Sequence, residues 1–296
     1  MHSDLERAVD LLRQGKPEPV DQALALLQST VFSFSMKMCG HREDAQDTSQ
    51  EVLIRALPYL HKFETPQALA SWLYKAARNY CISSRRQSKF APDAAHRLSL
   101  NELMPSGREL HEVISAAGMP NADAQLVQAE SSEKVRRALL KLAPEYRVIL
   151  VLHDMEGLNA PQVADIVGIQ PGTVRVRLHR ARLFLRRELN RPAGKRSRKD
   201  EVQRGSGCLG MFAALSDYLD GMIDDAACDQ MQLHIADCPP CQAFVESLRR
   251  TVEQCRGYQP KCSPERFQAF RKKLVRQYLE ASSVLKKSKS RSAKAH

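Results

Sequence analysis

Helical periodicity, sustained over most of the chain, is the feature that most restricts its fold. Apolar side chains recur every three or four residues through long stretches in which glycine and proline are sparse, and no alternating strand pattern persists. The sequence also contains no internal repeat. We therefore predict an all-α protein. The expected helices cover residues 5–13, 20–39, 42–62, 71–87, 132–142, 144–155, 160–167, 171–189, 208–219, 224–237, 239–256 and 264–285.

Length and composition set the number of domains and the class of protein. The 296 residues allow two or three domains, and a hydrophobic content of 43% is enough for each to bury a core. No apolar run approaches the roughly 20 residues of a membrane-spanning helix. The first residues, Met1 to Glu6, include acids where a secretory signal is basic and then apolar. We expect a soluble, cytoplasmic protein.

Two stretches lack apolar periodicity and are interpreted as linkers. Residues 91–130 are acidic and contain several prolines and glycines, and residues 191–207 are polar and contain glycine. They separate three predicted compact units, 1–90, 131–190 and 208–285. Residues 286–296 are expected to form a basic, disordered tail.

The net charge of +11 is concentrated in one part of the chain. From Pro171 to Lys199 Lys and Arg prevail and Glu188 is the sole acid, whereas acids outnumber bases in 91–130 and in 205–262. The basic segment is suited to a polyanion, and the two acidic segments would be repelled by it.

Residues 159–189 have the outline of a helix-turn-helix. Asn159 can cap a first helix that carries Pro161 in its first turn, and Gly168 can end it. A short turn then leads to Pro171, which opens a longer helix. Two helices joined by a tight turn with glycine are typical of DNA-binding domains.

The second helix of this motif has an apolar stripe and a basic face. The stripe consists of Val174, Leu178, Ala181 and Leu185. Arginine side chains suit phosphate oxygens and the acceptor edge of guanine. The alternative is an amphipathic helix whose charges are merely solvated, but one acid among so many bases leaves few partners within the helix. The candidate DNA-binding residues are Thr173, Arg175, Arg177, His179, Arg180 and Arg182, with Arg186 on the same faces.

Of the eight cysteines, six lie between 208 and 262, which in a cytosolic chain favours a metal or redox site. His234 and Cys238 share a helical face, and the spacing of Cys238 and Cys241 lets both sulfurs reach one metal. Three such ligands favour Zn²⁺, which takes a fourth. The alternative is a remnant site that binds no metal.

These motifs resemble known sequences. Residues 145–189 resemble domain four of bacterial extracytoplasmic-function (ECF) sigma factors, which reads the −35 promoter element. HREDAQDTSQEVLIRAL at 41–57 is similar to the domain-two helix that docks on the polymerase β′ clamp helices, and FETPQALASWLYKAARNY at 63–80 to the part that opens and reads the −10 element. The resemblance implies that 1–90 is sigma domain 2, 91–130 the interdomain linker and 131–190 sigma domain 4. It also implies core RNA polymerase (β′ clamp helices and β flap) and promoter DNA as partners, and no membrane.

The resemblance assigns roles within domain 2. Polymerase docking is implied for one polar helix face, whose opposite side is expected to carry Val52, Ile54 and Leu57. Trp72 is expected to be a core anchor rather than a base-stacking wedge. Ser83 departs from the family, which usually has aspartate there. The implied polymerase-binding residues are Asp47, Gln50, Glu51 and Arg55, and the implied −10 contacts are Arg78, Asn79, Arg85 and Arg86.

Residues 208–285 resemble the zinc-binding anti-sigma domain, in which an upstream His or Cys completes the metal site. This implies Zn²⁺ held by Cys208, His234, Cys238 and Cys241, with Cys228 as the rival fourth ligand. Cys255 and Cys262 are either surface thiols or sensors. By the same resemblance, this domain would contact the sigma domains of its own chain and regulate them in response to a metal or redox signal.

Three functions are therefore compared. The preferred one is an ECF sigma factor, not an enzyme, that is regulated in cis. The alternative is a stand-alone helix-turn-helix regulator with a metal-sensing domain. A zinc hydrolase is disfavoured because four protein ligands leave no open position for water.

Overall fold

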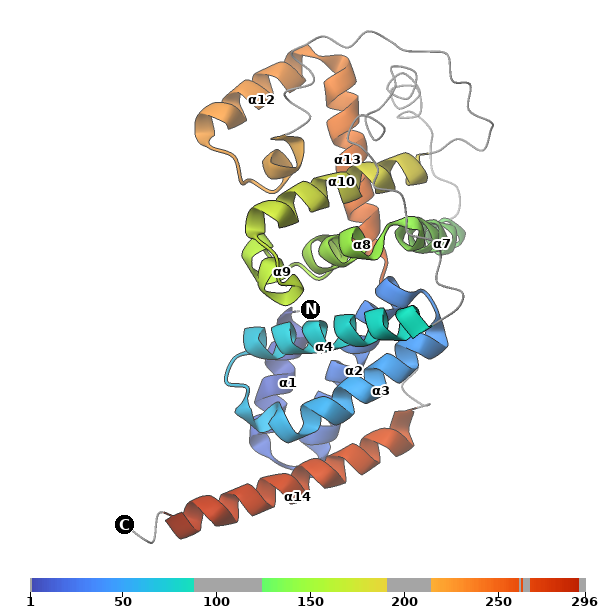
Figure 1. The fold of residues 1–296 in the computed structure, drawn as a ribbon. Coiled ribbons are helices and arrows are strands. Elements are labelled where there is room, and N and C mark those ends of the chain that lie inside the picture. Colours follow the sequence, from blue (N-terminus) through green and yellow to red (C-terminus); the bar gives the residue numbers. More distant parts are fainter. Residues whose placement is uncertain (1, 88–123, 191–213, 261, 263–266, 293–296) are drawn as a thin grey trace. The chain divides into compact units, whose positions relative to one another are not determined.

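The described part of the chain is helical and falls into two compact units. The computed structural model describes residues 2–87, 124–190, 214–260, 262 and 267–292 and has no strand among them. The first unit contains α1 to α4 and α14, and the second contains α7, α8, α9 up to Ala164, α10, α12 and α13 (Figure 1). The all-α prediction is confirmed.

The first unit is a bundle of α1, α2, α3 and α4, with the 3-10 segment η1 between α3 and α4. The core is formed by aliphatic and aromatic side chains such as Leu24, Phe34, Leu53 and Leu73, all fully buried. The bounds are α1 His2–Gln14, α2 Pro17–Cys39, α3 Arg42–Ala56, η1 Leu57–Lys62 and α4 Pro66–Gln87.

Two boundaries in this unit differ from the sequence prediction for local reasons. The helix expected over 42–62 ends at Ala56 and continues as η1, because Pro58 lacks the N–H that an α-helix would use. The helix expected from Ser71 begins at Pro66, because the Thr65 hydroxyl accepts a hydrogen bond from the Ala68 N–H at 3.2 Å and caps it.

The long helix α14, Gln268–Ser292, belongs to this first unit, packing on α2 and η1 (Figure 1). The Tyr278 hydroxyl donates to the Leu12 carbonyl at 3.4 Å, and the Arg271 guanidinium lies 3.2 Å from the Asp21 carboxylate. Phe267, Leu274 and Tyr278 are buried, and Phe270 is half-buried.

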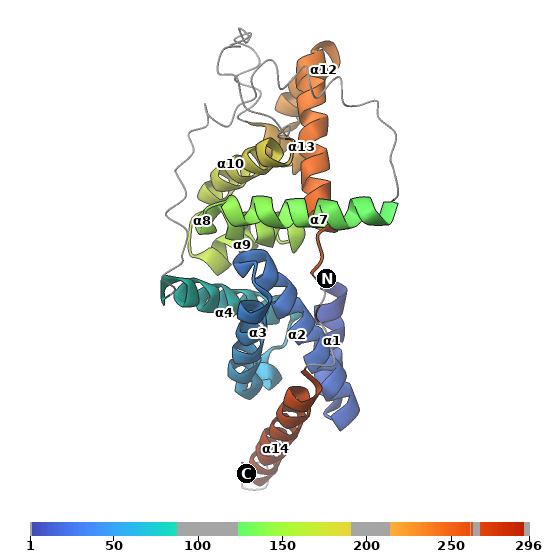
Figure 2. The same ribbon diagram turned by 90° about the vertical axis from the view of Figure 1, so that its right-hand side faces the viewer.

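The second unit is built around α10, Pro171–Leu189, whose apolar stripe is fully buried as predicted. Asn159 and Gln162 form a capping box at the start of α9, and Gly168 ends that helix with φ of 75°, a conformation that favours glycine. Figure 2 shows α7 crossing α13, which also packs on α10. The bounds are α7 Ala124–Lys141, α8 Pro144–Leu150, α9 Ala160–Val167, α12 Asp225–Asp237 and α13 Pro239–Gly257.

The helix expected over 144–155 changes its hydrogen-bond pattern near its end. Residues Val151–Met155 form a π-helical segment, η2, in which the Glu156 N–H bonds to the Val151 carbonyl at 2.9 Å. Such segments are rare and often lie at functional sites. The wider turn carries Asp154, which is buried.

The described helices divide the predicted 208–285 range between the two units. Residues 214–219, α12 and α13 belong to the second unit, whereas α14 belongs to the first. Helix α7 begins at Ala124, inside the range expected as linker, and α14 runs to Ser292, so the expectation of a disordered tail was wrong for residues 286–292. The rest of the first linker up to residue 123, the linker at 191–207 and residues 293–296 lie outside the described residues. The predicted domain boundaries remain predictions.

Candidate nucleic-acid interface and metal centre

The exposed face of α3 combines charged and apolar side chains. Asp47 and Arg55 are exposed, Gln50 and Glu51 are half-buried, and the Glu51 carboxylate pairs with Arg55 Nε at 2.6 Å. Ile54 was expected on the side opposite this polar face, together with Val52 and Leu57, and this was wrong. It is 49% exposed, because the buried face of α3 is set by Thr48, Val52 and Ala56 at helical spacing and Ile54 points away from it.

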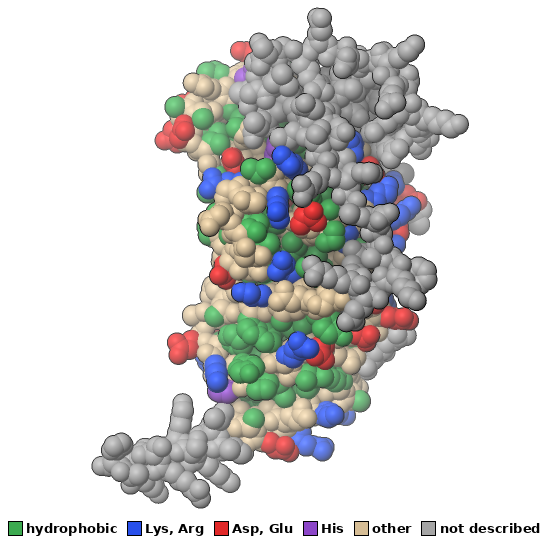
Figure 3. All heavy atoms as spheres, viewed as in Figure 1, with side chains coloured by type: hydrophobic (Ala, Val, Ile, Leu, Met, Phe, Trp, Pro, Cys, Tyr) green, Lys and Arg blue, Asp and Glu red, His purple; other side chains and the backbone are tan. Residues whose placement is uncertain are grey.

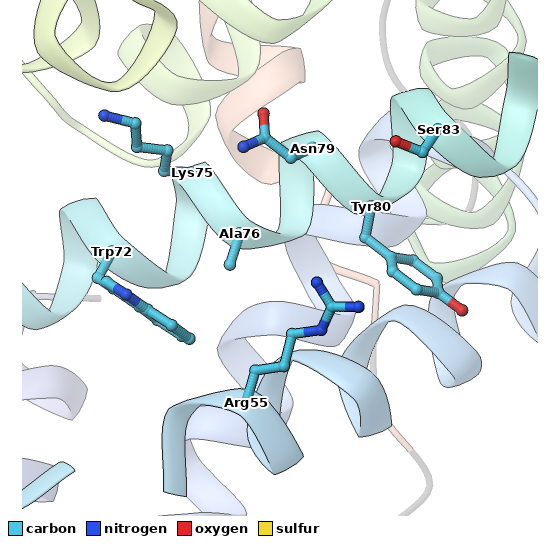
Figure 4. Close-up of a pocket in the computed structure, with 7 residues that line it drawn as sticks. All are labelled: Arg55, Trp72, Lys75, Ala76, Asn79, Tyr80 and Ser83. Carbon is cyan, nitrogen blue, oxygen red and sulfur yellow. The ribbon is translucent and has the colours of Figure 1, made fainter. Parts of the chain in front are cut away.

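A cavity of about 540 Å³ lies between α3 and α4. Figure 4 shows Trp72, Ala76 and Tyr80 along one side of α4, with the Arg55 guanidinium rising toward them from α3. The short side chain of Ala76 leaves the space open between the two rings. The cavity is lined by Arg55, Trp72, Lys75, Ala76, Asn79, Tyr80 and Ser83.

This cavity changes the interpretation of several residues. Trp72 is half-buried at the cavity, with its ring 6.1 Å from that of Phe63, so the prediction of a core anchor was wrong. Lys75 and Tyr80 were not selected from the sequence. The spacing of Trp72, Ala76 and Tyr80, at i, i+4 and i+8, would have placed the two rings on one face.

The other −10 candidates have different surroundings. Asn79 is exposed at the cavity and accepts a hydrogen bond from Arg78 Nη1 at 3.3 Å. Arg78 is half-buried, and burial lowers the pKa of its guanidinium. Arg85 and Arg86 belong to the last turn of α4, but their side chains lie outside the described residues.

The first half of α10 is open. Thr173 and Val176 are exposed, and Arg175, Arg177 and Arg180 are half-buried. In Figure 3 hydrophobic side chains gather in the lower part of the visible face, and Lys, Arg, Asp and Glu side chains are scattered around them and above them. Because the exposed Val176 lies among arginines, this half of the helix offers both cationic groups and methyl groups to a partner.

The second half of α10 is covered by the C-terminal segment. Arg182 is only 1% exposed, and its guanidinium donates to the carboxylate of Asp154 at 2.6 and 2.9 Å and to that of Asp220 at 2.7 and 3.0 Å. A hydrogen bond of 2.9 Å joins His179 Nδ1 and Ser216 Oγ. The structure therefore brings His179 and Arg182 to the C-terminal segment and away from solvent.

Burial and charge determine the protonation of this cluster. Burial raises the pKa of Asp154, but attraction to Arg182 and hydrogen bonds from Arg182 and His153 outweigh it and lower that pKa to about 2. Burial of Arg182 is likewise outweighed by its two carboxylate partners, so its pKa is raised. Burial, with the cations Arg182 and Arg180, lowers the pKa of His179 to about 4. At neutral pH the cluster therefore holds a neutral imidazole beside a paired guanidinium.

Helix α13 extends the cover beyond Arg182. Arg186 is buried, donates through Nε to Ser247 Oγ and lies over the Phe244 ring, with its guanidinium carbon 4.1 Å from the ring centre. Arg256 donates to the Asp154 carbonyl at 3.3 Å. Two arginines on the basic face of α10 are thus engaged by residues 214–258.

Three of the four predicted metal ligands lie together. The side-chain ligand atoms of His234, Cys238 and Cys241 are within 4.8 Å of one another, and His234 Nε2 lies 3.2 Å from Cys241 Sγ. Cys238 ends α12 and precedes α13, so the junction of the two helices presents both sulfurs to one point. Cys208 lies outside the described residues, and Cys228 is not part of the group.

The remaining C-terminal cysteines differ from each other. Cys255 is fully buried, and burial raises the pKa of its thiol, so the surface-thiol alternative was wrong for this residue. Cys262 is half-buried, and burial raises its thiol pKa as well. Both thiols are therefore weak nucleophiles in this arrangement.

Comparison with known families identifies three segments. Residues 24–90 match sigma-70 region 2, residues 132–185 match sigma-70 region 4, and residues 212–242 match a putative zinc-finger family. The zinc-finger match includes His234, Cys238 and Cys241, and it begins after Cys208.

The chain is also similar to characterised sigma factors. It is 28% identical to the ECF RNA polymerase sigma factor SigW of Bacillus subtilis over 64% of this chain and 98% of the relative. It is 32% identical to SigM of Mycobacterium tuberculosis over 50% of this chain and 65% of the relative, and 27% identical to SigG of that species over 76% and 63%.

The order of the two sigma-70 regions and these relatives define the class of protein, a transcription initiation factor. The chain carries both sigma-70 regions in order, its relatives named above are ECF sigma factors, and a putative zinc-finger domain follows the second region. Among the described helices, none is long and apolar enough to cross a membrane.

Proposed function

We propose that this sigma factor binds core RNA polymerase through α3, reads the −10 element with α4 and the −35 element with α10, and is regulated by its own C-terminal segment. The observation that supports this most is the combination of two sigma-70 regions with a mixed polar and apolar face on α3. A stand-alone DNA-binding regulator would have no use for that face.

The α3 face fits a protein partner. Ile54 at 49% exposure lies among Asp47, Glu51 and Arg55, which gives apolar area to bury and charges to orient the partner. We assign this face to the β′ clamp helices. The β flap is assigned to sigma domain 4 from the family alone.

The cavity beside α4 fits an unstacked base. The Trp72 and Tyr80 rings offer stacking surfaces, Asn79 offers both a donor and an acceptor, and Lys75 and Arg55 are cationic. Extruding a base costs a few kcal/mol, and stacking and hydrogen bonds at the cavity would offset that cost. We assign the melted −10 strand to this surface.

The open half of α10 fits duplex DNA. Thr173, Arg175, Arg177 and Arg180 are wholly or partly accessible, and the helix has the width that the major groove admits. We assign −35 contacts to this half. His179 and Arg182 could reach DNA only after residues 214–220 have moved away, so their assignment as contacts is conditional on that movement.

The C-terminal cluster fits Zn²⁺. One imidazole nitrogen and two sulfurs converge within 4.8 Å, and these are donors that zinc prefers. His234, Cys238 and Cys241 would hold the ion, and an upstream residue, Cys208 in our assignment, would complete it. The ion would supply a structural cross-link between α12 and α13.

Regulation in cis is supported by the cover on α10. Asp220 and Ser216 engage Arg182 and His179, and Phe244 and Ser247 engage Arg186. We propose that this docked state masks part of the DNA-reading helix, and that a change at the zinc cluster releases it. α14, which packs on α2 and η1, adds a contact to sigma domain 2.

Transcription with purified components tests the proposal. Core polymerase with the full chain is expected to yield promoter-specific transcripts, and a truncation after Arg204 is expected to yield more. Asp47→Lys with Glu51→Lys should abolish core binding, whereas the matched change Glu43→Lys with Asp44→Lys, at the start of α3, should not. Duplex binding without any core-dependent transcript would favour the stand-alone regulator instead.

Zinc is tested separately. The purified chain is expected to contain one equivalent of zinc by elemental analysis, and His234→Ala and Cys241→Ser should each lower it. A full zinc content in both variants would contradict the assigned ligands.

A further inference from the structure

Two cysteines that stand apart in the sequence meet inside the first unit. Cys39 is the last residue of α2, and Cys81 lies near the end of α4. Their sulfur atoms are 2.9 Å apart, although 42 positions separate the residues. Cys39 is 3% exposed and Cys81 is 2% exposed.

The backbone on both sides of this pair is fixed. Gly40, with φ of 77°, ends α2 directly after Cys39, and its N–H bonds to the Met36 carbonyl. Cys81 continues the buried face of α4 that runs through Tyr74 and Ala77. The pair is therefore held by helix packing, and neither sulfur lies on a loose segment.

A third helix closes the site. Thr48 of α3 is buried, its hydroxyl donates to the Asp44 carbonyl at 2.7 Å, and its oxygen lies 3.7 Å from Cys81 Sγ. The two thiols thus share a small enclosure formed by α2, α3 and α4.

The sulfurs need to move little to become bonded. A disulfide bond is about 2 Å long, so closure requires less than about 1 Å of approach between groups already in contact. Side-chain rotation and small helix shifts can supply that distance without changing the fold.

We propose that Cys39 and Cys81 are an oxidisable dithiol, and that a small hydroperoxide converts them to an intramolecular disulfide joining α2 to α4. One thiol loses its proton, and its thiolate sulfur attacks a peroxide oxygen, which breaks the O–O bond and gives a sulfenic acid; the leaving oxygen takes up the proton and departs as water. The second thiol sulfur attacks the sulfenic sulfur, forms the S–S bond and releases a second water. Two thiols are oxidised, and one hydrogen peroxide is reduced to two waters.

A small oxidant is specified because the enclosure is buried. Hydrogen peroxide is small enough to reach the pair during a brief local opening of the helix packing, whereas glutathione disulfide is too large to reach either sulfur in the folded protein. In a reducing compartment the bond would be transient, forming under oxidant and reversing with thiol reductants.

The disulfide would restrain the helix that carries the cavity. Among the described side chains of α4, Cys81 is the last that is fully buried, and it lies between Asn79 and Ser83, which both line the cavity. A covalent bond there would anchor the end of α4 against α2 and would leave the polar face of α4 unchanged. Formation of the bond does not depend on the proposed function, and only its consequence for promoter reading does.

Peptide mapping of the full-length chain tests the site. The zinc-supplemented protein is exposed to increasing hydrogen peroxide, remaining thiols are alkylated after denaturation, and the digest is examined by mass spectrometry without reductant. We expect a peptide pair joined through Cys39 and Cys81 that disappears on reduction. The proposal is overturned if both residues are fully alkylated at every dose that preserves the helical circular dichroism.

Variants and stability give a second measurement. Cys39→Ser and Cys81→Ser should each abolish the joined peptide, and Cys228→Ser, a half-buried cysteine outside the pair, should leave it. Oxidised wild-type protein should unfold at a higher temperature than reduced protein, and Cys39→Ser should show no such increase. Pairing of Cys39 or Cys81 with a C-terminal cysteine instead would also refute the site.

Transcription by the reduced protein is measured separately. If the joined peptide is absent while promoter-specific transcripts are normal, the dithiol proposal is refuted and the sigma-factor proposal is not. A joined peptide without promoter-specific transcripts would refute the sigma-factor proposal alone.

Discussion

The two halves of α10 are both rich in arginine, yet they lie in opposite environments. Around Arg177 the helix is open, whereas around Arg182 it is enclosed by Asp154, Asp220 and Ser216. An arginine is suited both to a phosphate and to a buried carboxylate, since the same planar donors serve each. The segment that covers each part of this helix therefore decides which partner an arginine there has.

The largest effect is expected from Arg182→Ala. Removing this guanidinium leaves Asp154 buried without its cation, which typically costs about 3–5 kcal/mol. Denaturant unfolding should therefore show strong destabilisation of the second unit. A loss below about 1 kcal/mol would mean that the covered half is as solvated as the open half.

The second-largest effect is expected from acidification, which should destabilise the covered half of α10. His179 has a folded pKa of about 4 against an ordinary value of 6.5, so the unfolded state binds more protons between these values. The contribution of His179 to the free energy of unfolding is fully present above pH 6.5. It should fall by about 3 kcal/mol as the pH drops to 4. Unfolding measured across this range tests it, and His179→Gln should remove that pH dependence. The low pKa of Asp154, about 2, acts only in a more acidic window below pH 4.

A smaller effect is expected from Asp220→Asn, which removes one of the two carboxylates on Arg182. Charge-assisted hydrogen bonds contribute about 1.5–3 kcal/mol, and Asp154 would still pair with the arginine. Amide hydrogen exchange in residues 214–219 should become faster, and promoter-specific transcription should rise. Asp229→Asn, which makes the same charge change at an exposed position of α12, is the control. Equal exchange and transcription in both variants would argue against masking by Asp220.

The smallest effect on stability is expected from Arg177→Ala in the open half, within about 0.5 kcal/mol. Its effect should appear in DNA binding, where losing a phosphate contact lowers the salt dependence of affinity by about one unit. Binding of −35 duplexes over a salt series measures this. A large loss of stability with unchanged salt dependence would erase the distinction between the two halves.

Much of the fold followed from local sequence signals. The cap at Asn159, the helix end at Gly168 and the stripe through Val174 and Leu185 predicted α9 and α10 at their observed bounds. The errors arose where one residue altered the local hydrogen bonding. Pro58 ended α3 early, and Thr65 capped α4 before its expected start.

The candidate sites were predictable in part. The ligand spacing of His234, Cys238 and Cys241 is local, so the sequence was sufficient to group them. The cavity beside α4 was missed because Arg55 comes from another helix, and because Trp72 was assigned to the core on hydrophobicity alone.

The sequence by itself determined the helices, the order of the two sigma-70 regions, the basic character of α10 and the spacing of the metal ligands. These properties depend on residues within a few turns of one another. Only the tertiary structure decided that Asp220 would meet Arg182, that Cys39 would meet Cys81, and that Ile54 would face outward. Contacts between distant segments depend on how whole helix faces pack, and no local pattern encodes that choice.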